Sequence, residues 1–174
     1  VTPLPQSGNQ KPRLFRLPAD EALINRMGFN NHGLDAIVRH LKTRPKGYIV
    51  GGNVGKNTAT TNNNAVADYL TVFSGLYNYV DYLVINVSCP NVSNLSKLQD
   101  KEELAKILFA VTDYRNAQLV RKPVLLKVSP DLNFHQLDDS LQLLLDYGLD
   151  GVIATNTSVS RQGLITDNRV VLDI

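Results

Sequence analysis

Hydrophobic positions along the chain follow two different periods. Four short, continuous apolar runs are typical of strands that are buried on both faces of a parallel sheet. These runs are YIVGGN (48–53), DYLVINVS (81–88), VLLKVS (124–129) and GVIATN (151–156). Between them, apolar residues recur every three or four positions, as on one face of a helix, in residues 64–78, 101–117 and 134–147. The alternation predicts an α/β protein with a parallel sheet and right-handed helical crossovers.

The residues ahead of this alternation predict two more helices. GLDAIVRHLKTRP (33–45) has an apolar face at helical spacing, and a proline follows its end. ADEALINRMG (19–28) reads as a short helix that Gly28 ends. The first 18 residues are rich in proline, glycine and basic groups, which favours a loop or a short hairpin.

Two of the later helices have well-defined apolar faces. The face of the helix over 101–117 consists of Leu104, Ile107, Leu108 and Val111. Its expected N-cap is Asp100, with Glu103 three residues later. The face of the helix over 134–147 consists of Leu137, Leu141, Leu144 and Leu145. Gly148 is expected to end this helix.

Two architectures share this alternation, an open doubly wound sheet and a (β/α)8 barrel. The turn GGNVGKN (51–57) lacks the GxGxxG spacing of a dinucleotide-binding open sheet. All four strands end in polar residues, and in a barrel the carboxyl ends of all strands surround one site. A whole barrel needs about 250 residues, so we expect residues 1–174 to form a single, incomplete barrel domain that lacks the first strand and the last strands.

Composition excludes several classes of function. The chain has 174 residues, of which 43% are hydrophobic, enough for a core. Its 18 basic and 16 acidic residues give a net charge of +2, too balanced to predict a nucleic-acid partner. One cysteine and three scattered histidines predict neither an internal disulfide nor a metal site. The chain has no membrane-spanning run, and its first residues resemble neither a signal peptide nor a natural start.

Amide side chains and one lysine stand at the ends of the four predicted strands. In a barrel, Asn53, Asn86, Lys127 and Asn156 would converge on one pocket. Amides both donate and accept hydrogen bonds, so they suit a ligand that carries amide and carbonyl groups. The alternative is that each side chain satisfies backbone groups at its own strand end. Their presence on four separate strands favours a site.

Lys127 and Cys89 are the candidates for charge and for proton transfer. A buried lysine without a partner is costly, so Lys127 should face an anion or an electron-rich ring, unless it points outward with its stem along the surface. Cys89 could be a small buried hydrophobe. It follows a strand in a polar loop, however, and a thiol, with a pKa of about 8.5, is a better acid or base than the hydroxyl of Ser88. Nucleophilic and general-base roles both remain open.

Several motifs then match a known family. VTPLPQSGNQKPRLFRL, INRMGFNNHG, GGNVGKN, INVSCPN, LLKVSPDL and IATNTSVSR occur in the order and spacing of the dihydroorotate dehydrogenases. Together they resemble the class 2, quinone-linked branch of that family. The resemblance covers almost the whole chain, apart from ITDNRVVLDI (165–174).

The resemblance implies a barrel that holds FMN and oxidises dihydroorotate to orotate in pyrimidine synthesis, with quinone as the electron acceptor. The substrate contacts that it implies are Asn25, Asn86, Asn91, Asn156 and Thr157. The implied FMN contacts are Asn53, Asn86, Lys127 and Thr155, and the lysine would stabilise the negative charge of reduced flavin. Cys89 falls on the catalytic base. Arg16 resembles an arginine at the quinone entrance, and its alternative is a solvated surface arginine.

One position departs from the class 2 pattern. Class 2 enzymes usually carry serine as the base, whereas cysteine is the habit of the soluble class 1 enzymes. We also expect membrane-associating helices before Val1 and glycine-rich phosphate-binding turns beyond Ile174. The chain by itself should therefore be soluble, bind FMN poorly, turn over little substrate and self-associate through open strand edges. The whole protein should lie peripherally on the bacterial inner membrane or on the mitochondrial inner membrane.

Other functions remain possible on sequence alone. The chain could be a non-catalytic piece of the enzyme, in which the site is never assembled. It could also be a class 1-like enzyme or a related flavin enzyme that reduces pyrimidines, which INVSCPN alone would allow. A barrel aldolase or isomerase without flavin is a further alternative, in which Lys127 would form a Schiff base.

Overall fold

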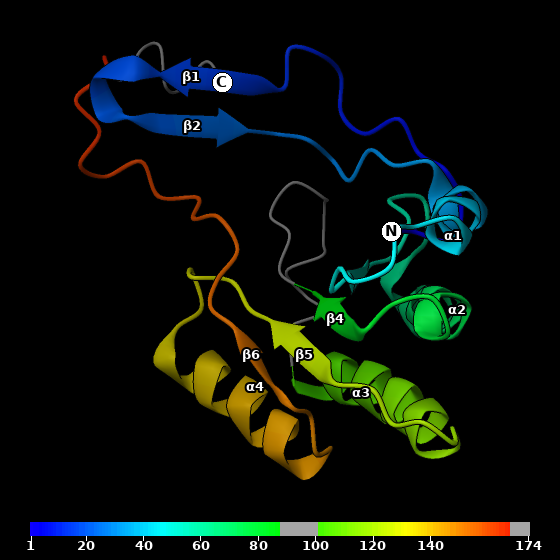
Figure 1. Ribbon diagram of the computed structural model, residues 1–174. Coiled ribbons are helices and arrows are strands. Elements are labelled where there is room, and N and C mark those ends of the chain that lie inside the picture. Colours follow the sequence, from blue (N-terminus) through cyan, green and yellow to red (C-terminus); the bar gives the residue numbers. More distant parts are fainter. Residues whose placement is uncertain (88–100, 168–174) are drawn as a thin grey trace.

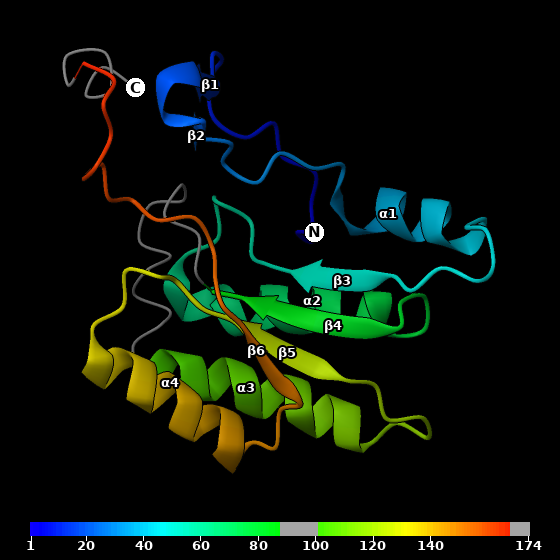
Figure 2. The ribbon, with the colours of Figure 1, turned by 60° about the vertical axis from the view of Figure 1, so that its left-hand side comes forward.

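The computed structural model describes residues 1–87 and 101–167. In order, its elements are β1 (Leu14–Leu17), the 3-10 helix η1 (Pro18–Asp20), β2 (Ala22–Asn25), α1 (Gly33–Lys42), β3 (Gly51–Val54), the 3-10 helix η2 (Asn62–Asn64), α2 (Ala65–Tyr77), β4 (Tyr82–Asn86), α3 (Lys101–Asn116), β5 (Val124–Lys127), α4 (Phe134–Asp146) and β6 (Gly151–Ile153). Figures 1 and 2 show the β1–β2 hairpin on one side of the main sheet and helices α2, α3 and α4 on the other.

The main sheet is parallel, and its strand order equals the chain order, β3-β4-β5-β6. A doubly wound sheet would reverse direction at a switch point and place helices on both faces. Here each crossover advances by one strand, and the crossover helices α2, α3 and α4 cover the same face. This single winding is that of a (β/α)8 barrel, so the chain forms a portion of such a barrel, as the sequence predicted.

The core lies between the sheet and these helices. The sheet contributes Val54, Leu83, Ile85, Val124 and Leu126, all of them buried. The helices contribute Tyr69, Val72, Phe73, Leu76, Leu104, Ile107, Leu108, Val111, Leu143 and Leu144. Fully burying one such side chain contributes about 1.5–3 kcal/mol, so this layer supplies most of the hydrophobic stabilisation. The predicted apolar face of α3 is confirmed residue by residue.

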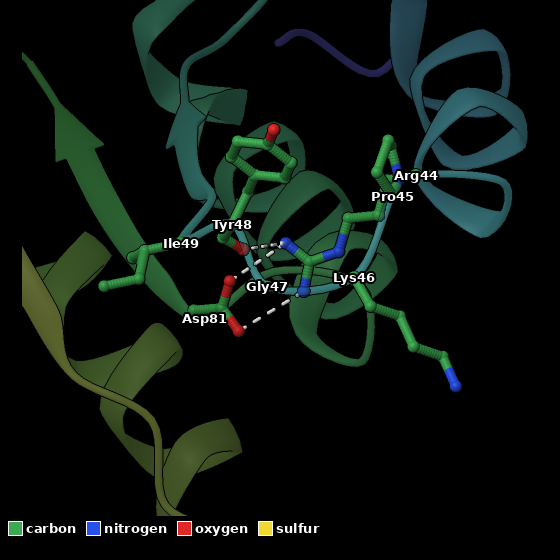
Figure 3. Close-up of a pocket in the computed structure, with 7 residues that line it drawn as sticks. All are labelled: Arg44, Pro45, Lys46, Gly47, Tyr48, Ile49 and Asp81. Carbon is green, nitrogen blue, oxygen red and sulfur yellow. Dashed lines mark hydrogen bonds and ion pairs between the residues drawn. The ribbon is translucent and has the colours of Figure 1, made fainter.

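An ion pair stabilises the amino-terminal end of β3. Arg44 donates from Nη1 to Asp81 Oδ2 at 2.9 Å and from Nη2 to Oδ1 at 3.3 Å, and Asp81 Oδ2 also accepts the Val50 backbone N–H at 2.8 Å. The Arg44 hydrogen bond, followed by that of Val50, lowers the pKa of Asp81 to about 2. Arg44 and Asp81 line an open cleft of about 430 Å³. Figure 3 shows the ion pair between them.

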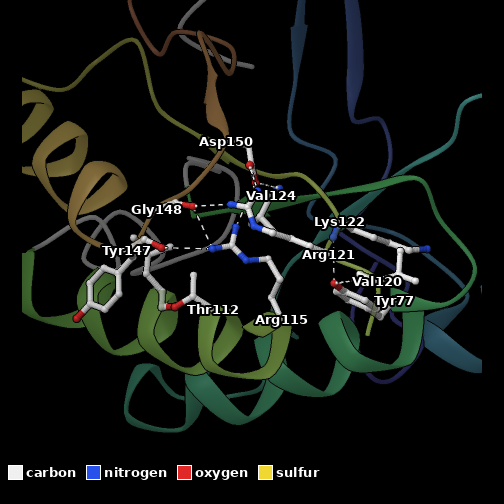
Figure 4. Close-up of polar contacts among 11 residues, drawn as sticks. Tyr77, Thr112, Arg115, Val120, Arg121, Lys122, Val124, Tyr147, Gly148 and Asp150 are labelled. Atoms are coloured by element: carbon white, nitrogen blue, oxygen red, sulfur yellow. Dashed lines mark hydrogen bonds and ion pairs between the residues drawn. The ribbon is translucent and has the colours of Figure 1, made fainter. Parts of the chain in front are cut away.

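A second arginine network stabilises the amino-terminal ends of β5 and β6 (Figure 4). Arg115, only 3% exposed, donates to Asp150 Oδ2 at 3.1 Å and to the Gly148 carbonyl at 3.0 Å. Asp150 Oδ2 accepts the Val124 N–H at 2.8 Å and is therefore joined to β5. Burial lowers the pKa of Arg115. Loss of Asp150 would leave the buried guanidinium of Arg115 without its counter-charge, so this end of the sheet serves stability.

One predicted helix is wrong. Residues 19–28 form η1 and β2 rather than a helix, because β2 pairs antiparallel with β1 from Leu14↔Asn25 to Leu17↔Ala22. The pairing buries Ile24 together with Leu17. In a strand, buried and exposed positions alternate, and four residues are too few for this alternation to be recognised in the sequence. The hairpin predicted for the first 18 residues is thus present, with a partner strand that extends beyond them.

Smaller differences concern the ends and faces of elements. β3 begins at Gly51, so Tyr48 and Ile49, which the sequence placed in the strand, lie before it, 70% and 83% exposed. On α4, Leu145 is 70% exposed and Leu143 is buried instead. The helices over 33–45 and 64–78 are confirmed as α1 and α2. Within the described residues, none of the helices combines the length and the hydropathy that crossing a membrane requires.

Candidate active site

The face of the main sheet that helices α2, α3 and α4 do not cover is called the inner face here. Its side chains alternate with those of the core, so Asn53 of β3, Asn86 of β4 and Lys127 of β5 all lie on it. Asn86 is directly paired with Lys127, which in turn is paired with Ile153. The structure therefore brings together three of the predicted site residues near the carboxyl ends of three adjacent strands.

Asn86 is the most enclosed of the three. It is only 3% exposed, and its carbonyl accepts a hydrogen bond from the Tyr69 hydroxyl at 2.7 Å. Tyr69 is fully buried on α2, so the helix holds the end of β4 in place. A cavity of about 100 Å³ adjoins this strand end, lined by Val1, Phe29, Asn30, Asn31, Asn53, Gly55 and Asn86.

The segment INRMGFNNHG forms the opposite wall of that cavity. Phe29 has a positive φ of 55°, which costs a bulky residue about 1–3 kcal/mol. Its carbonyl accepts from Asn31 Nδ2 at 2.7 Å and from Gln6 Nε2 at 3.1 Å. Asn31 Oδ1 in turn accepts the Gly33 N–H at 2.9 Å, at the start of α1. These bonds hold Phe29 in its strained conformation at the cavity that Asn53 and Asn86 also line.

Lys127 supplies positive charge to the inner face. Its side chain is half-buried at the end of β5. In residues 1–87 and 101–167, no hydrogen bond or ion pair engages its ammonium group. A partly buried cation of this kind favours an anionic or electron-rich ligand. Lys127 thus lies on the inner face of the sheet, and its role as a site residue stays a prediction.

Lys56 lies close in sequence to Asn53 but has a structural role. It is 2% exposed, and its ammonium group donates to the Thr60 carbonyl at 2.7 Å and to the Asn57 carbonyl at 3.3 Å. The pKa of Lys56 is lowered, because the effect of burial exceeds the opposing effect of the nearby Asp68 carboxylate. The lysine thus shapes the loop after β3 instead of pointing toward the inner face.

The loop after β6 carries the third group of predicted residues. The Asn156 N–H donates to the Val128 carbonyl at 3.0 Å, which continues the pairing of β5 and β6 beyond Ile153. Asn156 is half-buried, whereas Thr155 and Thr157 are exposed, and the Thr155 hydroxyl donates to the Asn156 carbonyl at 2.9 Å. The strand pairing therefore delivers this loop to the same end of the sheet as Lys127.

The hairpin brings two predicted residues to one surface. In the β1–β2 ladder, Arg16 pairs with Leu23 and Asn25 pairs with Leu14, so these four side chains share one face. Leu14 and Leu23 are 53% and 57% exposed, and Arg16 is exposed between them. An apolar surface with one guanidinium suits a ligand with an apolar body and a polar head.

Two predicted residues, Cys89 and Asn91, lie outside the described residues, as does Asp100, the expected cap of α3.

The sequence analysis also missed some residues that line the candidate site or hold its loops. Asn31 lines the cavity, and its position within INRMGFNNHG was the available signal. Asp131 and Asp20 accept hydrogen bonds from the chain after β6. Asp131 lies within the motif LLKVSPDL, whereas no local pattern marks Asp20, because its partners are distant in sequence.

The fold defines a portion of a (β/α)8 barrel protein, and the inner face at the carboxyl ends of its strands is the candidate ligand site. The family model described as "Dihydroorotate dehydrogenase" matches residues 1–173. The chain belongs to the dihydroorotate dehydrogenase family.

Named relatives agree with this assignment. "Dihydroorotate dehydrogenase (quinone)" of Christiangramia forsetii is 50% identical over 169 residues, which are 97% of this chain and 49% of the relative. The protein of the same name from Anaeromyxobacter dehalogenans is 46% identical over 167 residues, 94% of this chain and 46% of the relative. The chain thus spans about half the length of the curated relatives it matches.

Solved structures give the same result for the fold. Ligand-free DHODH from Eimeria tenella superimposes with a TM-score of 0.88 and 34% identity, covering 97% of this chain and 53% of that one. DHODH from the same organism in complex with ferulenol superimposes with a TM-score of 0.85 and 34% identity, covering 94% and 50%.

Proposed function

We propose that this chain is part of a quinone-linked dihydroorotate dehydrogenase, which oxidises dihydroorotate to orotate in pyrimidine biosynthesis. The observation that carries the proposal is the inner face, where Asn53, Asn86 and Lys127 meet at adjacent strand ends in a member of this family. The relatives named as quinone enzymes favour this branch over a class 1-like or pyrimidine-reducing enzyme.

The residues of the inner face fit FMN. Asn53 and Lys127 make no side-chain hydrogen bonds within the described part of the chain, so an amide and a cation remain available for an electron-rich, hydrogen-bonding ring system. We assign Asn53, Asn86, Lys127 and Thr155 to the cofactor. When bound, FMN supplies an acceptor for a hydride and can pass electrons on to a quinone.

The substrate is assigned to the amides and the thiol that surround this face. Asn25, Asn86, Asn91, Asn156 and Thr157 would bind the ring and carboxylate of dihydroorotate through paired donors and acceptors. Cys89 would remove the proton from C5 as the hydride leaves C6, because a thiol ionises much closer to neutral pH than a hydroxyl. The role of Cys89 rests on the resemblance of INVSCPN to the family motif.

The quinone is assigned to the exposed face of the hairpin. Leu14 and Leu23 would contact its apolar part, and Arg16 would bind a ring carbonyl. We propose that the whole protein lies peripherally on the inner membrane of a bacterium, or on the mitochondrial inner membrane, where a membrane-dissolved quinone is accessible. The 174-residue chain alone is proposed to be catalytically incomplete and prone to self-association.

The test uses a full-length protein that carries this sequence and follows quinone reduction driven by dihydroorotate. Lys127→Ala should lower kcat/KM by about 100-fold or more, because it removes charge beside the reacting groups. Asn86→Ala should raise the KM for dihydroorotate. Lys46→Ala, which removes an exposed lysine at the opposite end of β3, is the matched control and should leave turnover unchanged. Full activity of the Lys127 variant would contradict the proposal.

A further inference from the structure

The chain that follows β6 crosses from the candidate active site to the hairpin. Residues 154–167 leave the sheet and run toward the turn between β1 and β2, as Figures 1 and 2 show. Two carboxylates, Asp131 and Asp20, accept hydrogen bonds from this segment. It therefore connects the loop that carries Asn156 to the hairpin.

Asp131 holds the first part of the segment. Its Oδ1 accepts the Ser158 hydroxyl at 2.8 Å, and its Oδ2 accepts the Val159 N–H at 3.1 Å. The Asp131 N–H in turn donates to the Ser129 hydroxyl oxygen at 3.2 Å. Because Asp131 follows β5 and Ser158 follows β6, these bonds join the loops of two neighbouring strands beside the inner face.

Asp20 holds the last part of the segment. Its Oδ1 accepts the Ile165 N–H at 2.5 Å, and its Oδ2 accepts the Thr166 N–H at 3.2 Å as well as the Thr166 hydroxyl. The hydroxyl bond, followed by the Ile165 N–H, lowers the pKa of Asp20. Three donors more than 140 residues away in sequence thus meet one ionised carboxylate in the turn of the hairpin.

An apolar contact accompanies these bonds. Leu17 and Ile24, 4% and 7% exposed, form a small cluster that is separate from the main core. Phe15, Ala22 and Leu164 pack against it, and among the described residues Leu164 is the one member from outside the hairpin. The side of the hairpin opposite Arg16 is therefore completed by the segment after β6.

We propose that Asp20 is a positioning residue: by holding Ile165 and Thr166, it fixes the hairpin tip and orients Arg16 for the electron acceptor. The inference rests on the proposed function, which assigns Arg16 to the quinone. Arg16 pairs with Leu23 near the tip, whereas Asn25 lies at the other end of the ladder. Loss of Asp20 should consequently disturb the quinone side more than the dihydroorotate side.

The test compares Asp20→Asn, Thr166→Val and the double variant in a full-length protein that carries this sequence. Each single change should raise the KM for a short-chain quinone by about threefold to tenfold, with less than about a twofold change in the KM for dihydroorotate. The double variant should be no worse than Asp20→Asn alone, because the Thr166 hydroxyl bond is one of the three bonds that Asp20→Asn already weakens. Hydrogen exchange at the amides of Ile165 and Thr166 should accelerate in Asp20→Asn.

Two controls separate positioning from general destabilisation. Glu21→Gln removes the adjacent carboxylate, which has no side-chain hydrogen bond in the described part of the chain, and should leave both KM values unchanged. Thr166→Ser keeps the hydroxyl and should restore the quinone KM. The Thr166 variants also keep the test decisive if Asp20→Asn folds poorly.

Specific results would overturn the assignment. The positioning role would be refuted if Asp20→Asn left the quinone KM unchanged, or if Asp20→Asn and Glu21→Gln had equal effects. In either case, an active parent protein would still support the proposed function. Unchanged hydrogen exchange at Ile165 and Thr166 would refute its structural premise. A parent protein that reduces no quinone with dihydroorotate would instead refute the proposed function, and this assignment with it.

Discussion

At the scale of single residues, the two ends of the strands have different chemistry. The amino-terminal ends carry ion pairs, in which Asp81 and Asp150 each accept both an arginine and a backbone N–H. The carboxyl ends carry the amides of Asn53 and Asn86 and the ammonium group of Lys127. Paired charges stabilise the fold, whereas Asn53 and Lys127, whose side chains make no hydrogen bond or ion pair within the described residues, can bind a ligand. This division supports the assignment of the site to the carboxyl ends.

Cys89 gives the sharpest residue-scale prediction. If its thiol is the base, Cys89→Ser should need a higher pH for comparable turnover, because a hydroxyl is far harder to deprotonate than a thiol. The measurement is the pH profile of kcat for dihydroorotate-dependent quinone reduction in a full-length protein that carries this sequence. Cys89→Ala should abolish most turnover at every pH. A serine variant with the parent profile would remove Cys89 from the role of base.

At the scale of elements, side chains from neighbouring segments set where strands start and how loops lie. Asp81, just before β4, accepts the N–H of Val50, just before β3, and so aligns the two strands. Asn31 and Gln6 hold Phe29 at a positive φ. This backbone conformation keeps Phe29 in the wall of the cavity that Asn53 of β3 also lines. Element geometry around the site therefore depends on polar contacts between segments as well as on the core.

The Asp81 contact predicts a pH dependence of stability. The folded-state pKa of about 2 lies below the ordinary value of 3.8, so the stabilisation is present above about pH 4 and is lost as the pH falls toward 2. Asp81→Asn should therefore be less stable than the parent chain near neutral pH, and the difference should shrink toward pH 2. Urea unfolding of the 174-residue chain across this range measures it.

Salt and a second variant provide the controls for this effect. Because Arg44 and Asp81 are partly exposed, high salt should reduce the difference. Asp113→Asn removes an exposed carboxylate on α3 and should change stability little at any pH. A difference between Asp81→Asn and the parent chain that stays constant down to pH 2 would contradict the assignment of the low pKa to Asp81.

At the scale of the whole molecule, the described sheet is a sector of a barrel with two lateral edges. At the edge of β3, Val1 donates to the Asn53 carbonyl at 2.7 Å and accepts the Gly55 N–H at 3.0 Å, which is the bonding pattern of a parallel neighbour. Within the described residues, no strand pairs with the outer edge of β6. An exposed edge is a template for pairing with another chain.

This openness predicts how the 174-residue chain behaves by itself. It should retain little FMN after gel filtration, since the four described strands provide only part of the ring of loops that encloses a barrel ligand. It should also self-associate as its concentration rises, which sedimentation velocity measures. A stoichiometric flavin spectrum in the purified chain, or a monomer at all concentrations, would contradict these expectations.

Sequence pattern alone predicted much of this protein. The apolar runs and helical periods predicted the strands β3 to β6 and the helices α1 to α4, because burial of one face imposes a period that is local in sequence. The polar strand ends predicted the inner-face residues Asn53, Asn86 and Lys127. The motif order predicted the family, which the match over residues 1–173 confirms.

Tertiary structure alone decided the features that depend on distant partners. Residues 22–25 became a strand because β1 pairs with them, which overrode their local helical preference. Lys56 follows the strand β3 and Lys127 ends the strand β5. Only the tertiary structure shows that Lys56 is buried in a loop whereas Lys127 lies half-buried on the inner face. The contacts of Asp20 with Ile165 and Thr166 join segments more than 140 residues apart. A local sequence pattern reflects which residues of one segment are buried. Which distant segment it pairs with depends on the packing of the whole chain.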